Sequence, residues 1–368
     1  PPGGDCAGVV LQAGRGSHHL STDAAALGFS VASLASVARG PAAWLAPKPA
    51  ALSFEAACTL PITWSTVHAA LSGAQLRRGQ AMLIHAAAGG VGLAAVEYAK
   101  WLGVAVDGTA GKPHKHRALR QLGVRVTTSS RDASACAFGT ARAHRGRRFH
   151  AVLNSLSLDF ISLSVAMLSE GGAFEEIGKR GVWSAARMRK ASTAVRYNVL
   201  AIDNDMQQDP PWMQRTLQRL SRRAAKGVLH GLPTQAFDLA RDWEAAFRLL
   251  QSGRNVGKVV IRIARTKHNE SLAGSGSQLL TGGTGGLGLL TARWLAASRG
   301  APALVLASRS GALARGAAAE WALLGASGAA VRIVRCDAAE PAAVRRLLLA
   351  SAAGAAQLRG AWHAAGVL

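Results

Sequence analysis

Two short glycine-rich segments constrain the fold of this 368-residue chain more than any other feature. Each follows an apolar run and precedes a stretch with helical periodicity: one comes after residues 80–86 (QAMLIHA) and the other after residues 278–281 (QLLT). Glycines allow a backbone to approach a pyrophosphate closely, and the free amides and dipole of a helix N-terminus stabilise its negative charge. Both segments therefore predict dinucleotide-binding loops.

These loops supply the first candidate cofactor-binding residues. In the first loop the candidates are Ala86, Gly89, Gly90, Val91 and Gly92. The alternative for this loop is a tight turn that needs small residues for packing alone. The second loop has the spacing TGxxxGxG, and its candidates are Thr281, Gly282, Gly283, Thr284, Gly285, Gly286, Leu287 and Gly288.

Strand-like and helix-like stretches alternate around each loop. Around the first loop the stretches are residues 91–102, 104–109, 115–122, 151–154, 162–168, 172–177 and 199–202. A polar, glycine-rich linker is expected at 266–277. Beyond it the alternation restarts, with further strands expected at 303–308, 331–335 and 360–363. The pattern predicts an α/β fold with doubly wound parallel sheets.

The residues beyond each loop favour NADPH over NADH. After the second loop, the next strand ends in Ser308, Arg309 and Ser310, where an arginine favours the 2′-phosphate of NADP and an acidic residue would favour NAD. After the first loop, Asp107 lies inside the predicted strand and is assigned to packing. The cations near the expected 2′-phosphate are Lys112, Lys115 and Arg131, each with an ordinary surface charge as the alternative. Two loops predict two NADPH sites and hydride-transfer chemistry.

The composition excludes several classes of protein. With 49% hydrophobic and 17% charged residues, the chain is expected to form two or three packed domains. Its formal net charge of +23 comes from dispersed Lys and Arg residues, which indicates a solvated basic surface and no nucleic-acid partner. Four widely spaced cysteines and isolated histidine pairs predict no metal site. Neither a membrane span nor a leader peptide is visible, so a cytoplasmic location is expected, with an organelle left open because no initiating Met is present.

With these residues placed, the chain resembles an internal part of a modular (type I) polyketide synthase or animal-type fatty acid synthase. Residues 1–264 resemble the zinc-free enoylreductase domain through LPITWSTVHAAL, LIHAAAGGVGLAAVEYAKWLG, HAVLNSLS, GGAFEEIGK and NVGKVVI. Residues 277–368 resemble the first part of the ketoreductase domain through LLTGGTGGLG, LVLASRSG, RCDAAE and WHAAGVL.

The resemblance implies a medium-chain reductase fold, in which a partial GroES-like β domain accompanies a Rossmann domain. A truncated Rossmann-type short-chain reductase domain follows. The implied domains are residues 1–60 (part of the substrate domain), 61–203 (Rossmann domain), 204–264 (return to the substrate domain), 265–276 (linker) and 277–368 (N-terminal part of the ketoreductase).

It also implies a reaction, the NADPH-dependent reduction of a 2,3-enoyl thioester carried by an acyl carrier protein. Other synthase domains in cis and a homodimeric parent synthase are the implied partners. Lys179 and Asp203 match the positions proposed to assist protonation of the substrate. Their alternatives are a surface lysine and a helix-capping aspartate.

Further cofactor-binding residues are implied in both parts. Asn154 and Ser155 would line the nicotinamide ribose, and Lys258 would close the pocket. In the ketoreductase part Asp337 would contact the adenine. The residues that would border the cofactor there are Ala364, Ala365 and Gly366.

The chain departs from the family at several positions. Arg180 follows Lys179 where the family has Thr-Asp. The upstream Asn-Tyr or Asn-Phe element and the ketoreductase catalytic Ser, Tyr and Lys are not matched, so the second part is expected to bind cofactor at most.

Two alternatives to the synthase remain: a stand-alone quinone-oxidoreductase-like enzyme, and a catalytically silent or nucleic-acid-binding reductase relative.

Overall fold

The computed structural model describes residues 3–14, 17–263, 276–352 and 358–365. They form two compact units, Pro1–Ala264 and Arg265–Leu368, and each is described by itself. Within the described ranges, no helix combines the length and apolar character needed to cross a bilayer.

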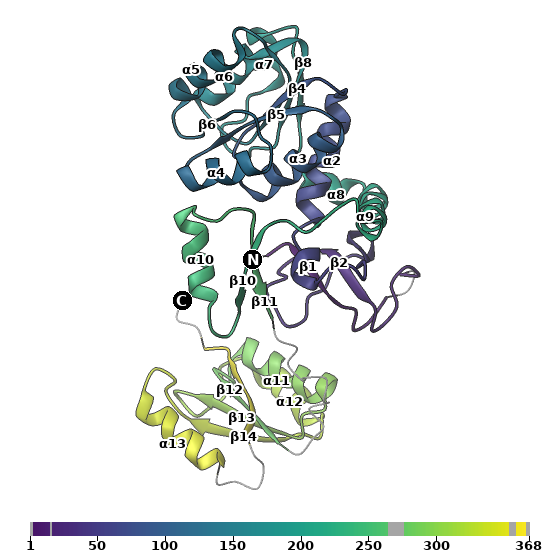
Figure 1. Ribbon diagram of the computed structural model, residues 1–368. Coiled ribbons are helices and arrows are strands. Elements are labelled where there is room, and N and C mark those ends of the chain that lie inside the picture. The colour runs from purple at the N-terminus through teal and green to yellow at the C-terminus, as the bar shows by residue number, and fades with distance from the viewer. Residues whose placement is uncertain (1–2, 15–16, 264–275, 353–357, 366–368) are drawn as a thin grey trace. The chain divides into compact units, whose positions relative to one another are not determined.

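Unit 1 contains a six-stranded parallel sheet with the order β6-β5-β4-β7-β8-β9 (Figure 1). Its strands are β4 (Ala81–Ile84), β5 (Ala105–Ala110), β6 (Thr127–Ser129), β7 (Phe149–Asn154), β8 (Leu168–Glu176) and β9 (Arg196–Val199). Parallel neighbours require crossover connections. The crossovers contain α3 (Gly90–Trp101), α4 (Pro113–Gln121), α5 (Ala133–His144), α6 (Asp159–Ala166) and α7 (Ala185–Ala191). β4 pairs with β7, so the winding direction reverses between these two strands.

Apolar side chains cover both faces of this sheet, because successive strand residues point to opposite faces. Leu83 packs with Ile161 of α6 and Met188 of α7. Its neighbours Met82 and Ile84 belong to a second, larger core that includes α3. Figure 1 shows α6 and α7 on the side of the sheet opposite α3.

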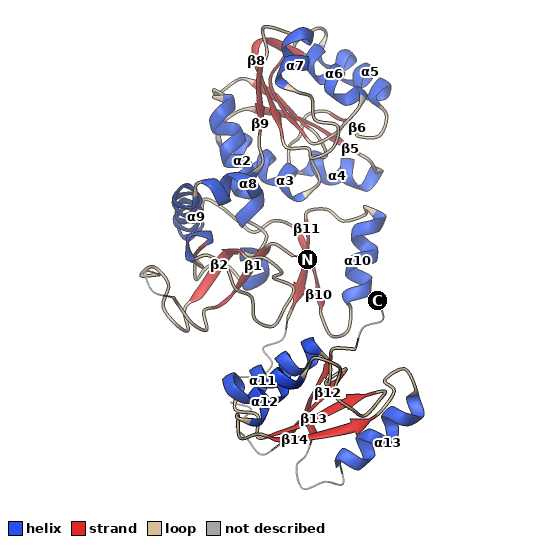
Figure 2. Cartoon of the chain, turned by 180° about the vertical axis from the view of Figure 1, so that it is seen from behind, coloured by secondary structure: helices blue, strands red, loops and turns tan. Residues whose placement is uncertain are grey.

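The rest of unit 1 is built from residues on both sides of the Rossmann segment. An antiparallel sheet contains β1 (Asp5–Val9), β2 (Ala25–Phe29) and β3 (Leu45–Pro47), and a parallel pair contains β10 (Thr234–Asp238) and β11 (Lys258–Arg262) (Figure 2). The helices are η1 (Ala42–Trp44), α1 (Phe54–Ala57), α2 (Pro61–Ala74), α8 (Ile202–Gln208), α9 (Pro210–Ala225) and α10 (Trp243–Ser252). Trp64 of α2 and Leu217 of α9 share the larger core with Met82 of the sheet, so one apolar core joins the two parts of the unit.

Unit 2 contains a four-stranded parallel sheet with the order β14-β13-β12-β15. Its strands are β12 (Ser277–Thr281), β13 (Ala303–Ser308), β14 (Ala330–Arg335) and β15 (Leu358–His363). The helices α11 (Gly286–Arg299) and α12 (Ala318–Gly325) pack on one face, and α13 (Pro341–Ala352) packs on the other (Figure 2). β12 pairs with β15, so the winding direction reverses between these two strands.

The predicted α/β class and parallel sheets are confirmed, but several boundaries differ and one strand was missed. The prediction treated residues 199–202 as a single stretch of the alternation, whereas β9 ends at Val199 and α8 begins at the buried Ile202. The apolar residues of this stretch belong to the end of a strand, a connection and the start of a helix. The short strand β6 was not predicted, because its sequence, TTS, contains no apolar run.

Candidate functional site

In unit 1 the candidate residues gather where the winding direction of the sheet reverses. Ligands of open α/β sheets bind outside the carboxyl ends of the strands at this point. The first glycine loop follows β4, Asn154 is the last residue of β7, and Lys179 follows the end of β8. The fold therefore brings these separately predicted residues to one edge of one sheet.

The first glycine loop leads directly into α3. Gly89 is the N-cap residue, so the first amides of the helix receive no side-chain cap. A Cβ built on Gly92 would lie 2.5 Å from Cα of Ala87, so the loop and the helix could not approach each other with any larger residue. The amide of Ala86 donates to Oγ1 of Thr109 on β5 at 3.0 Å, which fixes the entry to the loop.

The first glycine loop is more open at Gly89 than at Gly92. A Cβ built on Gly89 would meet only the carbonyl oxygen of Ala86, at 3.3 Å. Val91, another of the predicted residues, is the second residue of α3 and is half-buried. Uncapped helix amides beside open space fit the diphosphate of a dinucleotide. The geometry of this loop is compatible with the predicted dinucleotide site.

Asn154 and Ser155 lie between the ends of β4 and β8. Nδ2 of the buried Asn154 donates to Oε2 of Glu176 at 2.7 Å. Oγ of Ser155 donates to the carbonyl of His85, the residue before the glycine loop, at 3.4 Å. A Cβ built on Gly178 would lie 3.8 Å from the carbonyl carbon of Ser155, so the connections after β7 and β8 are in contact.

Lys179 and Asp203 are paired. Nζ of Lys179 donates to Oδ2 of Asp203, which lies in the first turn of α8. The two side chains are 71% and 55% exposed, so the pair faces open space and solvent screens it. The hydrogen bond from Lys179 lowers the pKa of Asp203. An ammonium group held at the sheet edge can donate a proton or stabilise a developing negative charge.

The predicted 2′-phosphate cations also lie near one another, beyond the end of β5. Burial, followed by the charges of Lys112 and Arg131, lowers the pKa of Lys115. Nζ of Lys112 donates to the carbonyl of Ser252, at the end of α10, at 3.0 Å. Accumulated positive charge at this place fits a phosphate. Lys112 is partly committed to a backbone acceptor, whereas Arg131 is exposed.

Asp107 has a structural role. Its buried carboxylate accepts a hydrogen bond from Nε2 of His144 and lies 3.6 Å from Nε of Arg125. Burial raises its pKa, and its two partners oppose that effect. This placement agrees with its assignment to packing inside β5.

Lys258 begins β11 and lies against the glycine loop. A Cβ built on Gly90 would be 2.8 Å from Cδ of Lys258. Its Nζ forms an ion pair with Oδ2 of Asp5 at 2.6 Å. Lys258 therefore lies close to the loop that it was predicted to close, and its ammonium has an acidic partner that the sequence analysis did not identify.

In unit 2 the second glycine loop follows β12 and leads into α11, whose N-cap residue is Gly285. A Cβ on Gly288 would lie 2.2 Å from the carbonyl oxygen of Gly282, so this helix also packs closely on its loop. Apart from its chain neighbours and the backbone of its own helix, no described atom lies within 4 Å of a Cβ built on Gly286. Thr284 is buried and Leu287 is 75% exposed. Gly283 donates its amide to Ala307 of β13 at 3.2 Å.

The other predicted residues of unit 2 lie at the carboxyl ends of the same sheet. Ser308 ends β13, Arg309 and Ser310 follow it, and Oγ of Ser308 accepts from the amide of Gly311 at 3.1 Å. Asp337 follows β14, where its Oδ1 accepts from the amide of Ala339 at 3.0 Å. The predicted residues after β15 are Ala364 and Ala365, which are 2.7 Å from a Cβ built on Gly282, whereas Gly366 lies outside the described residues. The amide of Ala364 donates to Thr281 at 2.9 Å.

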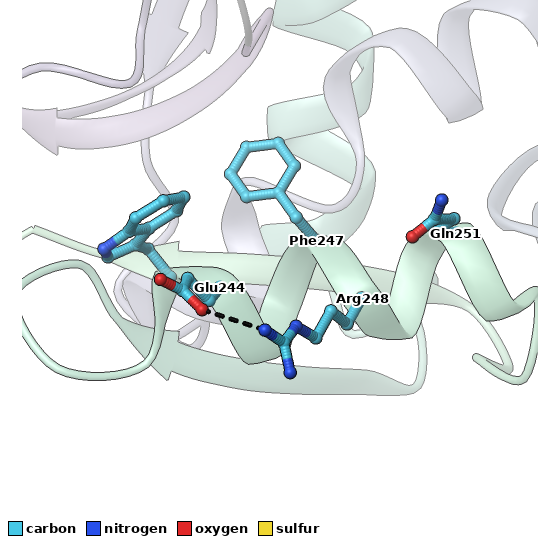
Figure 3. Close-up of a pocket in the computed structure, with 5 residues that line it drawn as sticks. Glu244, Phe247, Arg248 and Gln251 are labelled. Carbon is cyan, nitrogen blue, oxygen red and sulfur yellow. Dashed lines mark hydrogen bonds and ion pairs between the residues drawn. The ribbon is translucent and has the colours of Figure 1, made fainter.

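Neither unit offers a metal site among its described residues, where no group of three His, Cys, Asp or Glu side chains is placed to hold an ion. A separate surface hollow of about 370 Å³ lies on α10 and is lined by Trp243, Glu244, Phe247, Arg248 and Gln251. Figure 3 shows the side chain of Phe247 pointing away from the helix and a hydrogen bond from Arg248 to Glu244. Nη2 of Arg248 lies 3.2 Å from Oε2 of Glu244. None of the predicted site residues lines this hollow.

Two site residues were missed by the sequence analysis. Glu176 holds Asn154, and Asp5 holds Lys258. The pair EE in FEEIGK could have drawn attention to Glu176, because two acids at the end of an apolar strand are unusual. Nothing in the sequence marks Asp5, whose partners lie 57 and 253 residues away.

Two family profiles match the chain. Residues 122–261 match the family described as zinc-binding dehydrogenase, and residues 276–368 match the KR domain. The mycoketide-CoA synthase of Mycobacterium tuberculosis is 35% identical over 369 residues, which cover 100% of this chain and 9% of that protein. The spectinabilin polyketide synthase system protein NorB of Streptomyces orinoci is 37% identical over 370 residues, which cover 100% of this chain and 16% of that protein. The chain spans less than a fifth of either relative.

Solved structures resemble the larger unit. The crystal structure of CurK enoyl reductase is 30% identical, with a TM-score of 0.63, and the match covers 71% of this chain and 78% of that one. The CurF ER cyclopropanase of the curacin A pathway is 26% identical, with a TM-score of 0.64 and the same coverage. The Escherichia coli quinone oxidoreductase complexed with NADPH is 22% identical, with a TM-score of 0.60, and shares the fold over 71% of this chain and 84% of its own. The medium-chain reductase fold of unit 1 is thereby confirmed.

Proposed function

This chain belongs to the enoyl reductase family of modular polyketide synthases, with a KR domain following, and from that premise we propose that unit 1 reduces 2,3-enoyl thioesters with NADPH. The domain limits proposed for it are residues 1–60 and 204–264 for the substrate domain and residues 61–203 for the Rossmann domain. Residues 265–276 are proposed as the linker, and residues 277–368 as the cofactor-binding part of a β-ketoacyl reductase.

The pairing of Lys179 with Asp203, near the carboxyl ends of the strands in the sheet that carries the glycine loop, supports this proposal. Lys179 follows the end of β8 and its partner Asp203 lies in α8. The connection after β8 contacts the connection after β7, in which Ser155 donates a hydrogen bond to the carbonyl of His85, just before the loop. A cofactor diphosphate at the start of α3 and a proton donor at Lys179 would thus lie along one sheet edge. Reduction of a carbon–carbon double bond needs both a hydride donor and a proton donor.

The protein groups have distinct roles in this reaction. When bound, NADPH supplies a hydride for the β-carbon of the enoyl thioester. The two electrons of the double bond then reside on the enolate, and its α-carbon takes one proton, which completes the saturated thioester. Lys179 holds that proton at Nζ and stabilises the enolate oxygen, and Asp203 holds the ammonium in place through their hydrogen bond. Asn154 and Ser155 bind the nicotinamide ribose.

Cofactor preference follows from the cations beyond β5. Lys112, Lys115 and Arg131 are proposed to bind the 2′-phosphate of NADPH. In support, the pKa of Lys115 is lowered by burial and then by the charges of Lys112 and Arg131, so the three cations are close enough to interact. In unit 2 we assign the same role to Arg309, and a second NADPH is proposed for the loop at Thr281–Gly288. Neither site is proposed to need a metal.

The partners are proposed from the family. An acyl carrier protein would present the enoyl or β-ketoacyl thioester, other synthase domains would lie in cis, and the parent synthase would be a homodimer in the cytoplasm. The formal net charge of +23 would favour contact with an acidic carrier protein. Nucleic acid is not proposed as a partner.

The function is tested by mixing the 368-residue protein with NADPH and crotonyl pantetheine and following NADPH consumption together with formation of butyryl pantetheine. We expect turnover with one butyryl thioester formed for each NADPH consumed, and much slower turnover with NADH. Saturable NADPH binding with no reduction of the thioester would refute the proposed reaction. Equal reduction of a quinone and the thioester would favour the quinone-oxidoreductase alternative.

A further inference from the structure

Segments that are far apart in the sequence meet at Asp5, on β1. Its Oδ1 accepts a hydrogen bond from the amide of Ile62 at 2.8 Å, and its Oδ2 lies 2.6 Å from Nζ of Lys258. The side chains of Asp5 and Lys258 are 12% and 27% exposed. Both carboxylate oxygens are engaged in a place that is largely shielded from water, where a charged hydrogen bond is stronger than at the surface.

The contact with Ile62 completes the start of α2. This helix begins at Pro61, and its N-cap residue, Leu60, makes no side-chain cap. The first amides of a helix lack intrahelical partners and attract negative charge. Asp5, on strand β1, therefore supplies to helix α2 the carboxylate that a capping residue would otherwise provide.

Lys258 connects this carboxylate to the nucleotide loop. A Cβ built on Gly90 would lie 2.8 Å from Cδ of Lys258 and 3.1 Å from Cγ2 of Thr63, so Gly90 is enclosed between β11 and α2. Beside it, the amide of Gly257 donates to the carbonyl of Ala88 at 2.9 Å. The ion pair, the first turn of α2 and the nucleotide loop thus form one packed cluster.

We propose that Asp5 is a positioning residue for the cofactor. Paired with Lys258, it forms a clamp that holds the Ala88–Gly90 part of the loop against the start of β11 and keeps the Lys258 ammonium at the N-terminus of α3. This inference rests on the proposed function, because the ligand of the loop is then the diphosphate of NADPH. A loop that is already ordered binds its ligand more tightly than one that the ligand must order.

The clamp is tested first without cofactor, by hydrogen exchange in the whole chain. Asp5→Asn preserves the size of the side chain and removes its charge, and we expect the amides of Ile62 and Gly257 to exchange about tenfold faster. Glu55→Gln is the matched control, because Glu55 of α1 accepts from Nε of Arg262 on the same strand β11 at 2.9 Å. Unchanged exchange in Asp5→Asn, or equal acceleration in Glu55→Gln, would overturn the clamp whatever the protein binds.

The effect on the cofactor is measured by fluorescence titration with NADPH. Asp5→Asn and Lys258→Gln are each expected to raise the Kd about tenfold, and the double variant is expected to raise it no further, because both changes remove one pair. Lys258→Arg keeps the charge and should recover most of the affinity, with a melting temperature close to that of the parent protein. Additive losses in the double variant would refute the coupling. A parent protein that binds no NADPH, yet shows the exchange difference, would refute the proposed function and leave the clamp standing.

Discussion

Nδ2 of Asn154 donates a hydrogen bond to Oε2 of Glu176 at 2.7 Å, which joins the carboxyl ends of β7 and β8. Oε1 of Glu176 accepts from the amide of Gly178 at 2.6 Å, so the same side chain orders the residues that lead to Lys179. Burial raises the pKa of Glu176, and these two hydrogen bonds oppose the rise. Glu176 thereby connects the residue proposed to bind ribose with the proposed proton donor.

Glu176→Gln is expected to lower kcat/KM for the enoyl thioester about tenfold, because a glutamine offers only one oxygen to the two donors. Glu175→Gln is the control, since adjacent strand residues point to opposite faces of the sheet. Steady-state kinetics on both folded variants would check this. Equal kinetics for the two variants would contradict a positioning role for Glu176.

Lys179→Ala is expected to lower kcat about 100-fold, because a positioned general acid contributes at least that factor. The Kd for NADPH should change little, since the lysine pairs with Asp203 and not with the glycine loop. Arg180→Ala, an exposed neighbour, should retain turnover. A kcat equal to that of the parent protein would remove Lys179 from the mechanism.

Gly89→Val should abolish NADPH binding in a protein that still folds, because the space beside Gly89 is open to a ligand and its φ of −80° suits any residue. Gly92→Ala should instead lower the melting temperature, since its Cβ would meet backbone atoms of Ala87 at 2.5 Å. Fluorescence titration and thermal unfolding separate the two effects. Full NADPH binding by a folded Gly89→Val protein would show that the diphosphate binds elsewhere.

The double variant Lys115→Ala/Arg131→Ala should reduce the preference for NADPH over NADH about tenfold or more, because charged hydrogen bonds to the 2′-phosphate are lost. Affinity for NADH should stay nearly constant, and the salt dependence of NADPH binding should weaken. Arg120→Ala is the control, as Arg120 is an exposed cation of α4 whose Nε donates to the carbonyl of His116 at 3.3 Å. The same loss of preference in the control would indicate general charge attraction and no specific phosphate site.

Glu175 should make stability depend on pH. Burial raises its pKa from 4.5 to about 7, and Asn198 and Arg196 oppose the rise. Because the folded protein binds this proton more tightly than the unfolded chain, the contribution to stability falls as pH rises from 4.5 to about 7 and is constant above.

Glu175→Gln removes this titration while retaining an acceptor for Nδ2 of Asn198, which lies 2.9 Å from the carboxylate. The variant should therefore be more stable than the parent protein by about 1–3 kcal/mol near pH 8, and the difference should shrink toward acid pH. Urea unfolding at several pH values measures it. A stability difference that does not change with pH would show that Glu175 titrates normally.

Much of this protein follows from local sequence. Apolar runs that precede glycine loops and helical periodicity determine the parallel sheets, and glycine at positions such as Gly92 and Gly288 determines where a helix can pack on its loop. The loops and the residues after each strand were therefore predictable from short motifs, whereas Lys179 and Asp203 were named separately from the family resemblance and their pairing came from the structure. A dinucleotide-binding loop is built from residues that are close together along the chain, and the carboxyl ends of parallel strands meet at one edge of the sheet.

The tertiary structure alone decided the partners of those residues. Asp107 pairs with His144, Glu176 with Asn154, and Asp5 with both Ile62 and Lys258 across 57 and 253 residues. A charged side chain that is removed from water needs a complementary group, and any of several basic residues could satisfy an acid in the sequence. Which one does so depends on how β1, α2 and β11 pack, and packing is a property of the whole core rather than of any segment.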